Sequence, residues 1–347
     1  MSACTLKSPS SVCLLLKDQR VNVNELDNGG HTPLWWAARY GSLDVIKLWI
    51  ASGREMDLGK PGDIDKTDAI GVAKEVGNTE VVTLLERFKS DPAKTRSETA
   101  LFLACEKGSA EIVEKLLKVE GIDVNKGELS PLFAALEGNY FDIIDMLIGH
   151  PGIDVNMSDR NGNSPLFTAC ERGLDKVVEK LLRVDGIDVN KKNSGGGTPF
   201  GVACCDGRTS CVRLLLKDAR VNVNVNDNFG STALQEAASN GRIDIIRWWI
   251  ASGRRMDDIE FAIIEGRWQN DTVTLLERFQ QSRPQTRAEM RAELGISGES
   301  PHPWPTFCPS LLIAFYIRPL QSNQRRRFGP DASNPFGKNS HRIFLGG

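Results

Sequence analysis

The sequence predicts an all-α solenoid in which short helix pairs stack side by side and β-hairpin fingers project between them. Three observations predict it. A residue that can cap a helix recurs every 31 to 36 residues, a glycine or asparagine follows nine residues later, and an amphipathic segment comes next. Repetition at this period is typical of repeat proteins, because each unit buries its apolar face only against its neighbours.

The first helix of each unit is predicted from its two ends. Ser, Thr and Asp side chains accept hydrogen bonds from unpaired amides at a helix start, and proline directly after them needs no N–H there. Glycine or asparagine adopts the left-handed conformation that ends a helix. The caps are Thr32, Asp68, Thr99, Ser130, Ser164, Thr198 and Thr232, and the closing residues are Gly41, Gly77, Gly108, Asn139, Gly173, Gly207 and Gly241.

The second helix and a polar return complete the unit. Segments such as "AEIVEKLL" and "FDIIDMLI" carry an apolar stripe at helical spacing. The motif "GIDVN" follows at 121–125, 152–156 and 186–190, and its Asn, Asp and Gly residues favour turns.

A unit of about 33 residues that reads T/S-P-L-x-x-A-A/C-x-x-G, then V-V-x-L-L, then G-x-D-V-N resembles the ankyrin repeat. The resemblance covers roughly residues 12–283 and about eight units. It implies stacked helix pairs, and a concave surface of finger tips and first helices that binds other proteins. It implies neither catalysis nor a cofactor.

A longer duplication lies within the array. Residues 12–57 align with 212–257, with 29 of 46 positions identical, and "TEVVTLLERF" at 79–88 matches "NDTVTLLERF" at 270–279. Residues 58–66 have no counterpart. About half of the differences in the first alignment fall on the finger and first helix, which favours a common frame with a varied binding surface.

The tryptophans divide between these two roles. Trp49 and Trp249 lie beside the apolar stripe of a second helix and are expected in the core. Trp35 is expected to pack between neighbouring units, with a surface contact as the alternative. Trp36 fits an exposed interface anchor as well as a packed residue.

We therefore predict a non-enzymatic scaffold that binds a partner protein or peptide on its concave face. The alternative is a regulatory or targeting arm of a longer multidomain enzyme or channel. The predicted contact residues are His31, Trp36, Arg39, Tyr40, Glu106, Lys107, Glu137, Arg160, Asn161, Asn163, Glu171, Arg172, Phe229, Ser231 and Asn240.

Other chemistry finds little support. Only four histidines occur, and none lies in a catalytic or ligand-like cluster. Cys204, Cys205 and Cys211 lack zinc-site spacing, so we expect core packing and no metal. The loop "SGGGTPFG" lacks the lysine of a phosphate loop.

Composition and the chain ends set the remaining expectations. A net charge of −2 does not favour binding to nucleic acid. No apolar run is long enough to span a membrane. We expect a cytoplasmic protein, with the nucleus as the alternative, that is monomeric unless its N-terminal edge self-associates. The predicted regions are a truncated first repeat at 1–24, the array at 25–283, a short charged helix at 284–297 and a disordered tail at 298–347. Within the last unit, Gly266 and Trp268 replace the regular ending, as in a terminal cap.

Overall fold

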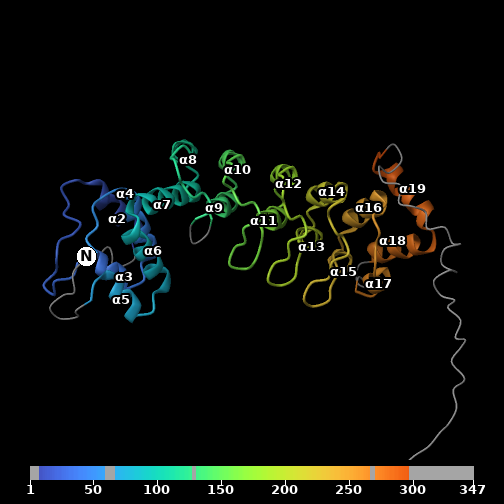
Figure 1. The fold of residues 1–347 in the computed structure, drawn as a ribbon. Helices are drawn as coiled ribbons and strands as arrows, with labels where there is room; N and C mark the ends of the chain where they lie inside the picture. Colours follow the sequence, from blue (N-terminus) through green and yellow to red (C-terminus); the bar gives the residue numbers. More distant parts are fainter. Residues whose placement is uncertain (1–7, 59–66, 127–129, 266–269, 297–347) are drawn as a thin grey trace, which may run out of the picture. The chain divides into compact units, whose positions relative to one another are not determined.

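The computed structural model describes residues 8–58, 67–126, 130–265 and 270–296, which form eighteen helices (Figure 1). In chain order these are α2 (Pro9–Lys17), α3 (Pro33–Arg39), α4 (Leu43–Ser52), α5 (Ala69–Glu75), α6 (Thr79–Ser90), α7 (Pro92–Glu106), α8 (Ala110–Leu116), α9 (Pro131–Gly138), α10 (Phe141–Ile148), α11 (Pro165–Arg172), α12 (Asp175–Leu182), α13 (Pro199–Cys205), α14 (Thr209–Lys217), α15 (Ala233–Ser239), α16 (Ile243–Ser252), α17 (Ile259–Glu265), α18 (Asn270–Gln281) and α19 (Arg283–Glu293). The predicted all-α repeat fold is confirmed.

The helix boundaries follow the predicted caps with one exception. The side chains of Thr32, Asp68, Ser164, Thr198 and Thr232 each accept a backbone N–H three residues later. Ser130 begins α9 without such a bond. All seven closing residues, Asn139 included, have positive φ. Cap and closing residues thus fix first helices of seven or eight residues in these units.

Thr99 is the exception, and the prediction that it starts a helix is wrong. It lies inside α7, where its hydroxyl donates to the carbonyl of Thr95 at 2.7 Å. The helix begins about two turns earlier, where Asp91 accepts the amide of Lys94 at 3.0 Å and Pro92 follows. The preceding sequence is helix-compatible, so the helix extends backwards to the first strong cap.

The fingers are tight turns, and the described residues contain no strand. In three fingers the amide of an aspartate donates to the carbonyl four residues on, as from Asp27 to His31 and from Asp227 to Ser231, both at 3.0 Å. One isolated bridge joins Asn226 and Thr232. The predicted β-hairpins are therefore reduced to hairpin-like turns, because too few residues flank each tip for a ladder.

The asparagine of the polar return links neighbouring units, in addition to forming the turn that the sequence predicts. The side-chain amide of Asn156 donates to the carbonyl of Gly186 at 2.8 Å, and its oxygen accepts the amide of Asp188 at 2.8 Å. Asn125 and Asn190 bind the next unit in the same way. A carboxamide both donates and accepts, so one side chain joins two consecutive returns.

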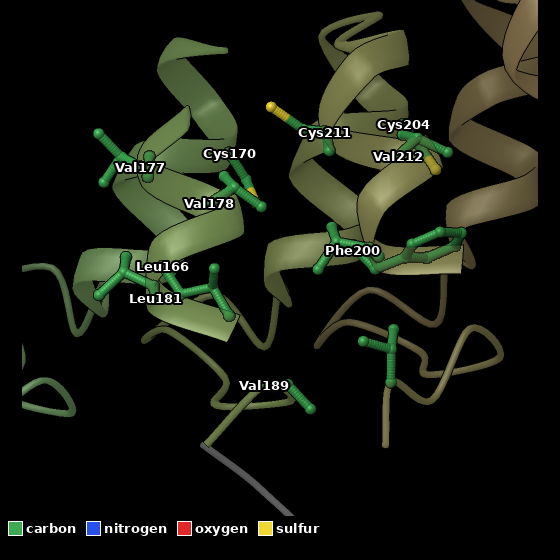
Figure 2. Packing of buried hydrophobic residues seen from close by; sticks show 14 of the residues in the cluster. Leu166, Cys170, Val177, Val178, Leu181, Val189, Phe200, Cys204, Cys211 and Val212 are labelled. Carbon is green, nitrogen blue, oxygen red and sulfur yellow. The ribbon is translucent and has the colours of Figure 1, made fainter. Parts of the chain in front are cut away.

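The apolar side chains pack in two separate clusters. One runs from Val12 to Phe88 and the other from Leu101 to Met290. In Figure 1, α10, α12 and α14 lie on one side of the row formed by α9, α11 and α13, and the fingers lie on the other. Figure 2 shows part of the second cluster, where Cys170 of one unit lies near Cys211 of the next.

Helix α7 joins the two clusters and departs from regular stacking. It packs against α4, α6 and α9, whereas α3 packs against α5 as neighbouring first helices do. Its N-terminal half corresponds to α19, which packs against α16 and α18. The guanidinium of Arg96 donates to the carbonyl of Ile50 at 3.2 Å, and that of Arg287 donates to Ile250 at 3.3 Å. The duplication therefore extends into these helices.

The predicted core tryptophans are confirmed, since Trp49 and Trp249 are 2% and 0% exposed. Helix α19 covers most of the segment for which the sequence predicts a charged helix. The predictions for Gly266, Trp268 and residues 298–347 lie outside the described residues.

Candidate protein-binding surface

The ends of successive first helices form a row across the second cluster. Helices α7, α9, α11, α13 and α15 pack each against the next, so their C-terminal residues lie side by side. Glu106, Lys107, Glu137, Glu171, Arg172 and Asn240 belong to this row and are all exposed. The structure thus brings together the helix-end residues that the sequence predicts.

Three arginines in or beside this row donate to backbone carbonyls. A guanidinium nitrogen of Arg172 donates to the carbonyl of Glu137 at 2.8 Å, and Arg208 donates to the carbonyl of Glu171 at 2.8 Å. Arg242 donates to the carbonyl of Cys205 at 3.1 Å. The last carbonyls of a helix have no partner within the helix, so each arginine caps the first helix of the preceding unit.

The carboxylates of the row are not held in this way. The side chains of Glu137 and Glu171 are exposed. The carboxyl of Glu171 is nevertheless partly desolvated, and this desolvation, together with the nearby charges of Asp206 and Asp159, raises its pKa. Repulsion of this kind is relieved when a cation approaches. The row therefore presents acidic oxygens beside guanidiniums whose geometry is fixed.

The finger between α10 and α11 carries three of the predicted contact residues, of which one is buried and two are exposed. Asn163 is 9% exposed, bonds Asp159 at 3.1 Å and accepts from Asn193 at 3.0 Å. It therefore supports the fingers and does not offer the contact that the sequence predicts. Arg160 pairs with Glu80 of α6 at 2.5 Å, and Asn161 is exposed beside it.

The finger before α15 carries an exposed aromatic ring. Phe229 is 89% exposed, and its amide donates to Asp227 at 2.9 Å. The half-buried Ser231 donates its amide to the same oxygen at 2.8 Å. The turn holds Phe229 outward on a rigid tip, which is an arrangement typical of an interface anchor.

The first unit gathers four aromatic rings. His31 is 8% exposed and stacks on Trp35 at 3.9 Å, and Trp36 stacks on Tyr40 at 5.8 Å. The indole of Trp36 donates to Asp27 at 2.7 Å. His31 is thus a buried packing residue and not the predicted surface contact, Trp35 is buried as expected, and Trp36 is half-buried.

Two residues of the first unit remain on the surface. Tyr40 is 46% exposed, and the exposed Arg39 places its guanidinium 5.3 Å from the Trp35 ring centre. They lie at the C-terminal end of α3, which packs against α5 in the first cluster. The structure therefore separates these residues, with Trp36, from the row of the second cluster.

Sequence reasoning missed the acidic neighbours Asp159 and Asp206. Asp159 could have been found from its recurrence, because the same aspartate stands at 27 and 227 before each finger tip. Asp206 carried no such pattern, since the residue before the closing glycine varies between units.

Cys204 and Cys211 are packing residues. Cys204 and Cys211 are fully buried, and burial raises the pKa of the Cys211 thiol to about 11. A thiol that stays protonated is a poor metal ligand or nucleophile. No group of three or more acidic, histidine or cysteine side chains in the described part of the chain is placed to hold a metal ion. None of the helices described is long and apolar enough to cross a bilayer.

Comparison with known proteins yields one family. The model for ankyrin repeats in three copies matches residues 1–92, 69–159, 120–193 and 166–259, which together span well over half of the chain. No curated protein matches the sequence.

Proposed function

Because the chain belongs to the ankyrin-repeat family, whose repeats are protein–protein interaction modules, we propose that it is a non-enzymatic binding scaffold. Its partner is a protein or peptide that lies along the row of first-helix ends in the second cluster and reaches the Phe229 finger. A fold of this kind serves many partners, so the surface chemistry must identify the class of partner.

The acidic side chains of the row are the observation that carries this proposal. Glu137 and Glu171 are exposed, and the arginines between them already donate to backbone carbonyls. A basic side chain from a partner gains a charge-assisted hydrogen bond without displacing any of these contacts. An acidic partner is disfavoured, because its carboxylates would lie beside Glu137 and Glu171, and like charges repel.

Phe229 supplies an apolar contact on the finger that precedes α15, the last helix of the row. An exposed aromatic ring contributes most to binding when a partner covers it completely. The partner segment therefore combines lysine or arginine residues with an apolar residue at a fixed separation.

Selection of displayed random peptides tests this proposal. The full chain is the target, and a Glu137→Lys, Glu171→Lys variant is the counter-selection target. A Glu111→Lys, Glu114→Lys variant is the matched control, because both residues are exposed on the second helix α8. We expect selected peptides rich in Lys and Arg that bind the control variant like the native chain and lose at least tenfold in affinity for the first variant.

Two results contradict the proposal. Peptides of acidic or purely apolar composition place the recognition elsewhere, and equal losses in both variants reduce the effect to overall charge. Addition of salt provides a second check, since exposed charge contacts weaken as ionic strength rises.

We also place the protein in the cytoplasm, with the nucleus as the alternative. The six described cysteines are free thiols, which suits a reducing compartment. Detection of a tagged chain by cell fractionation tests this location.

A further inference from the structure

The first unit carries apolar side chains that the described residues leave partly or largely uncovered. Leu14 and Leu15 of α2 are exposed, and Val21 and Val23 of the return that follows are half-buried. We call these four residues, with the backbone of the return, the α2 face. It is separate from the row of first-helix ends described above.

The duplicated block contains the same face in a covered form. The alignment of residues 12–57 with 212–257 pairs each residue of the α2 face with one in the second copy. There Leu215, Val221 and Val223 are 0%, 1% and 4% exposed, where α12 of the preceding unit and α13 pack against α14. The second copy therefore shows which kind of surface fits the α2 face.

The backbone of the return adds a polar feature. In the second copy, the side chain of Asn190 donates to the carbonyl of Arg220 at 2.8 Å and accepts the amide of Asn222 at 2.7 Å. The corresponding carbonyl of Arg20 and amide of Asn22 form no hydrogen bond with any described residue. A carboxamide both donates and accepts, so one asparagine of an incoming chain satisfies both groups.

The guanidinium of Arg20 adds a second polar feature. In the second copy, Arg220 donates to the carbonyl of Leu182, in the last turn of α12, at 2.6 Å. Among the described residues Arg20 bonds only Asp18, at 3.0 and 2.8 Å, and its side chain is 89% exposed. The last carbonyls of a helix have no partner within that helix, so Arg20 can cap a helix that lies along α2.

We infer that the α2 face binds an ankyrin-type helix pair of a partner protein, end to end. The partner's second helix lies along α2 as α12 lies along α14, and its last carbonyls meet Arg20. An asparagine of the partner's return bridges the Arg20 carbonyl and the Asn22 amide. This is a second protein-binding surface, so the inference does not depend on the proposed binding row.

A second copy of the chain does not supply this partner from its described residues. The bridging asparagines are Asn24, Asn125, Asn156, Asn190 and Asn224, and each belongs to a unit against which a further unit already packs. The return after α16 runs from Gly253 to Asp258 and only Ser282 separates α18 from α19, so neither contains asparagine. The helix pair therefore comes from a different protein.

A designed ankyrin-repeat protein serves as the probe, because consensus repeats fold independently of this chain. The probe keeps its N-terminal cap and ends on residues 164–192 of this chain, the unit that precedes α14. One control probe carries Asn190→Ala, and another keeps its polar C-terminal cap after the same unit. The full native chain is mixed with each probe, and affinity and amide exchange are measured.

We expect the first probe to slow amide exchange in α2 and at Asn22. The Asn190→Ala probe should bind at least tenfold more weakly, because the bridge is lost, and the capped probe should not bind. In the full chain, Leu15→Asp should abolish binding of the first probe. Ile112→Asp is the matched control, since Ile112 is 50% exposed on the second helix α8.

The Glu137→Lys, Glu171→Lys variant should bind the probe like the native chain, which separates this surface from the proposed binding row. Failure of the probe would leave the row untouched, and failure of the row would leave the probe result untouched.

The inference is overturned by any of three results. The probe leaves amide exchange in α2 unchanged, either control probe binds as tightly as the first, or α2 of the native chain alone is already as protected as α14. In the third case, sedimentation distinguishes a second copy, which doubles the mass, from coverage within one chain. All three comparisons use the native chain, so they stand even where Leu15→Asp fails to fold.

Discussion

Residues 14–16 and 214–216 are both Leu-Leu-Leu, yet their surroundings differ. In α14 the side chain of Leu215 is fully buried, because α12, α13 and α16 pack around that helix. In α2, which packs against α4, the side chains of Leu14 and Leu15 are 69% and 44% exposed. The same amphipathic segment is therefore a core element in one place and an edge in the other.

The two copies differ also in what they place on a shared frame. Ser52 and Ser252 each bond the carbonyl of the tryptophan three residues earlier at 2.6 Å. On the finger, a side chain at Gly29 would come within 2.8 Å of the His31 ring, whereas Ser231 in the other copy leaves room for Phe229. A phenylalanine at position 29 is therefore incompatible with the His31 ring as it is placed in the first copy.

The largest effect is expected from the buried tryptophans. Trp49→Ala and Trp249→Ala should each lower the free energy of unfolding by about 4 kcal/mol, through lost burial and the cavity left behind. Because the two clusters are separate, Trp49→Ala should speed amide exchange in α3, α4 and α6 and spare α11 to α14. Uniform loss of protection after either change would mean that the clusters unfold as one unit.

The leucine pair sharpens the contrast between core and edge. Leu215→Ala should cost about 3 kcal/mol, whereas Leu15→Ala should cost less than about 1 kcal/mol because Leu15 is already partly hydrated. Denaturant unfolding measures both values, and amide exchange should be faster in α2 than in α14. Equal protection of the two helices would show that α2 is covered in solution and would favour self-association at that edge.

The ion pairs give a smaller difference. Glu98→Ala leaves Arg87 without its partner in a mostly buried place and should cost about 2 kcal/mol. Glu289→Ala should cost less than about 1 kcal/mol, since that pair is largely exposed. Thermal unfolding of the two variants compares them, and equal shifts in Tm would contradict the burial difference.

The smallest effect concerns the Asp27 finger. Burial raises the pKa of this carboxyl, but hydrogen bonds from the His31 amide, the Trp36 indole and the Gly29 amide outweigh it, so the pKa is lowered. Its contribution to stability is present above the unfolded value of about 3.9 and is lost as the pH falls through the lowered value. Trp36→Phe removes one donor and should raise this pKa.

NMR titration of the Asp27 carboxyl carbon measures that change. Asp18 is the internal control, because its pKa is lowered by hydrogen bonds from Arg20, which the substitution leaves in place. An unchanged Asp27 titration would show that the indole does not stabilise the carboxylate.

The candidate surface was predictable where its position depends on local sequence. The helix-end residues Glu106, Glu137 and Glu171 are exposed as expected, because the closing glycine or asparagine fixes where each helix stops. His31 and Asn163 were misplaced, because their burial depends on contacts with Trp35 and Asn193 that the repeat pattern does not specify.

The repeat unit follows from the amino-acid sequence alone, because caps, closing residues and apolar stripes act over distances of a few residues within one unit. Packing between units sets the remaining features: Thr99 lies inside a longer helix, α7 packs on α4, and the buried Glu98 lines a cavity at that junction. These features depend on which surfaces meet across units. The repeat pattern predicts how one unit folds. It does not predict how the two clusters meet at α7, because the pattern is interrupted there.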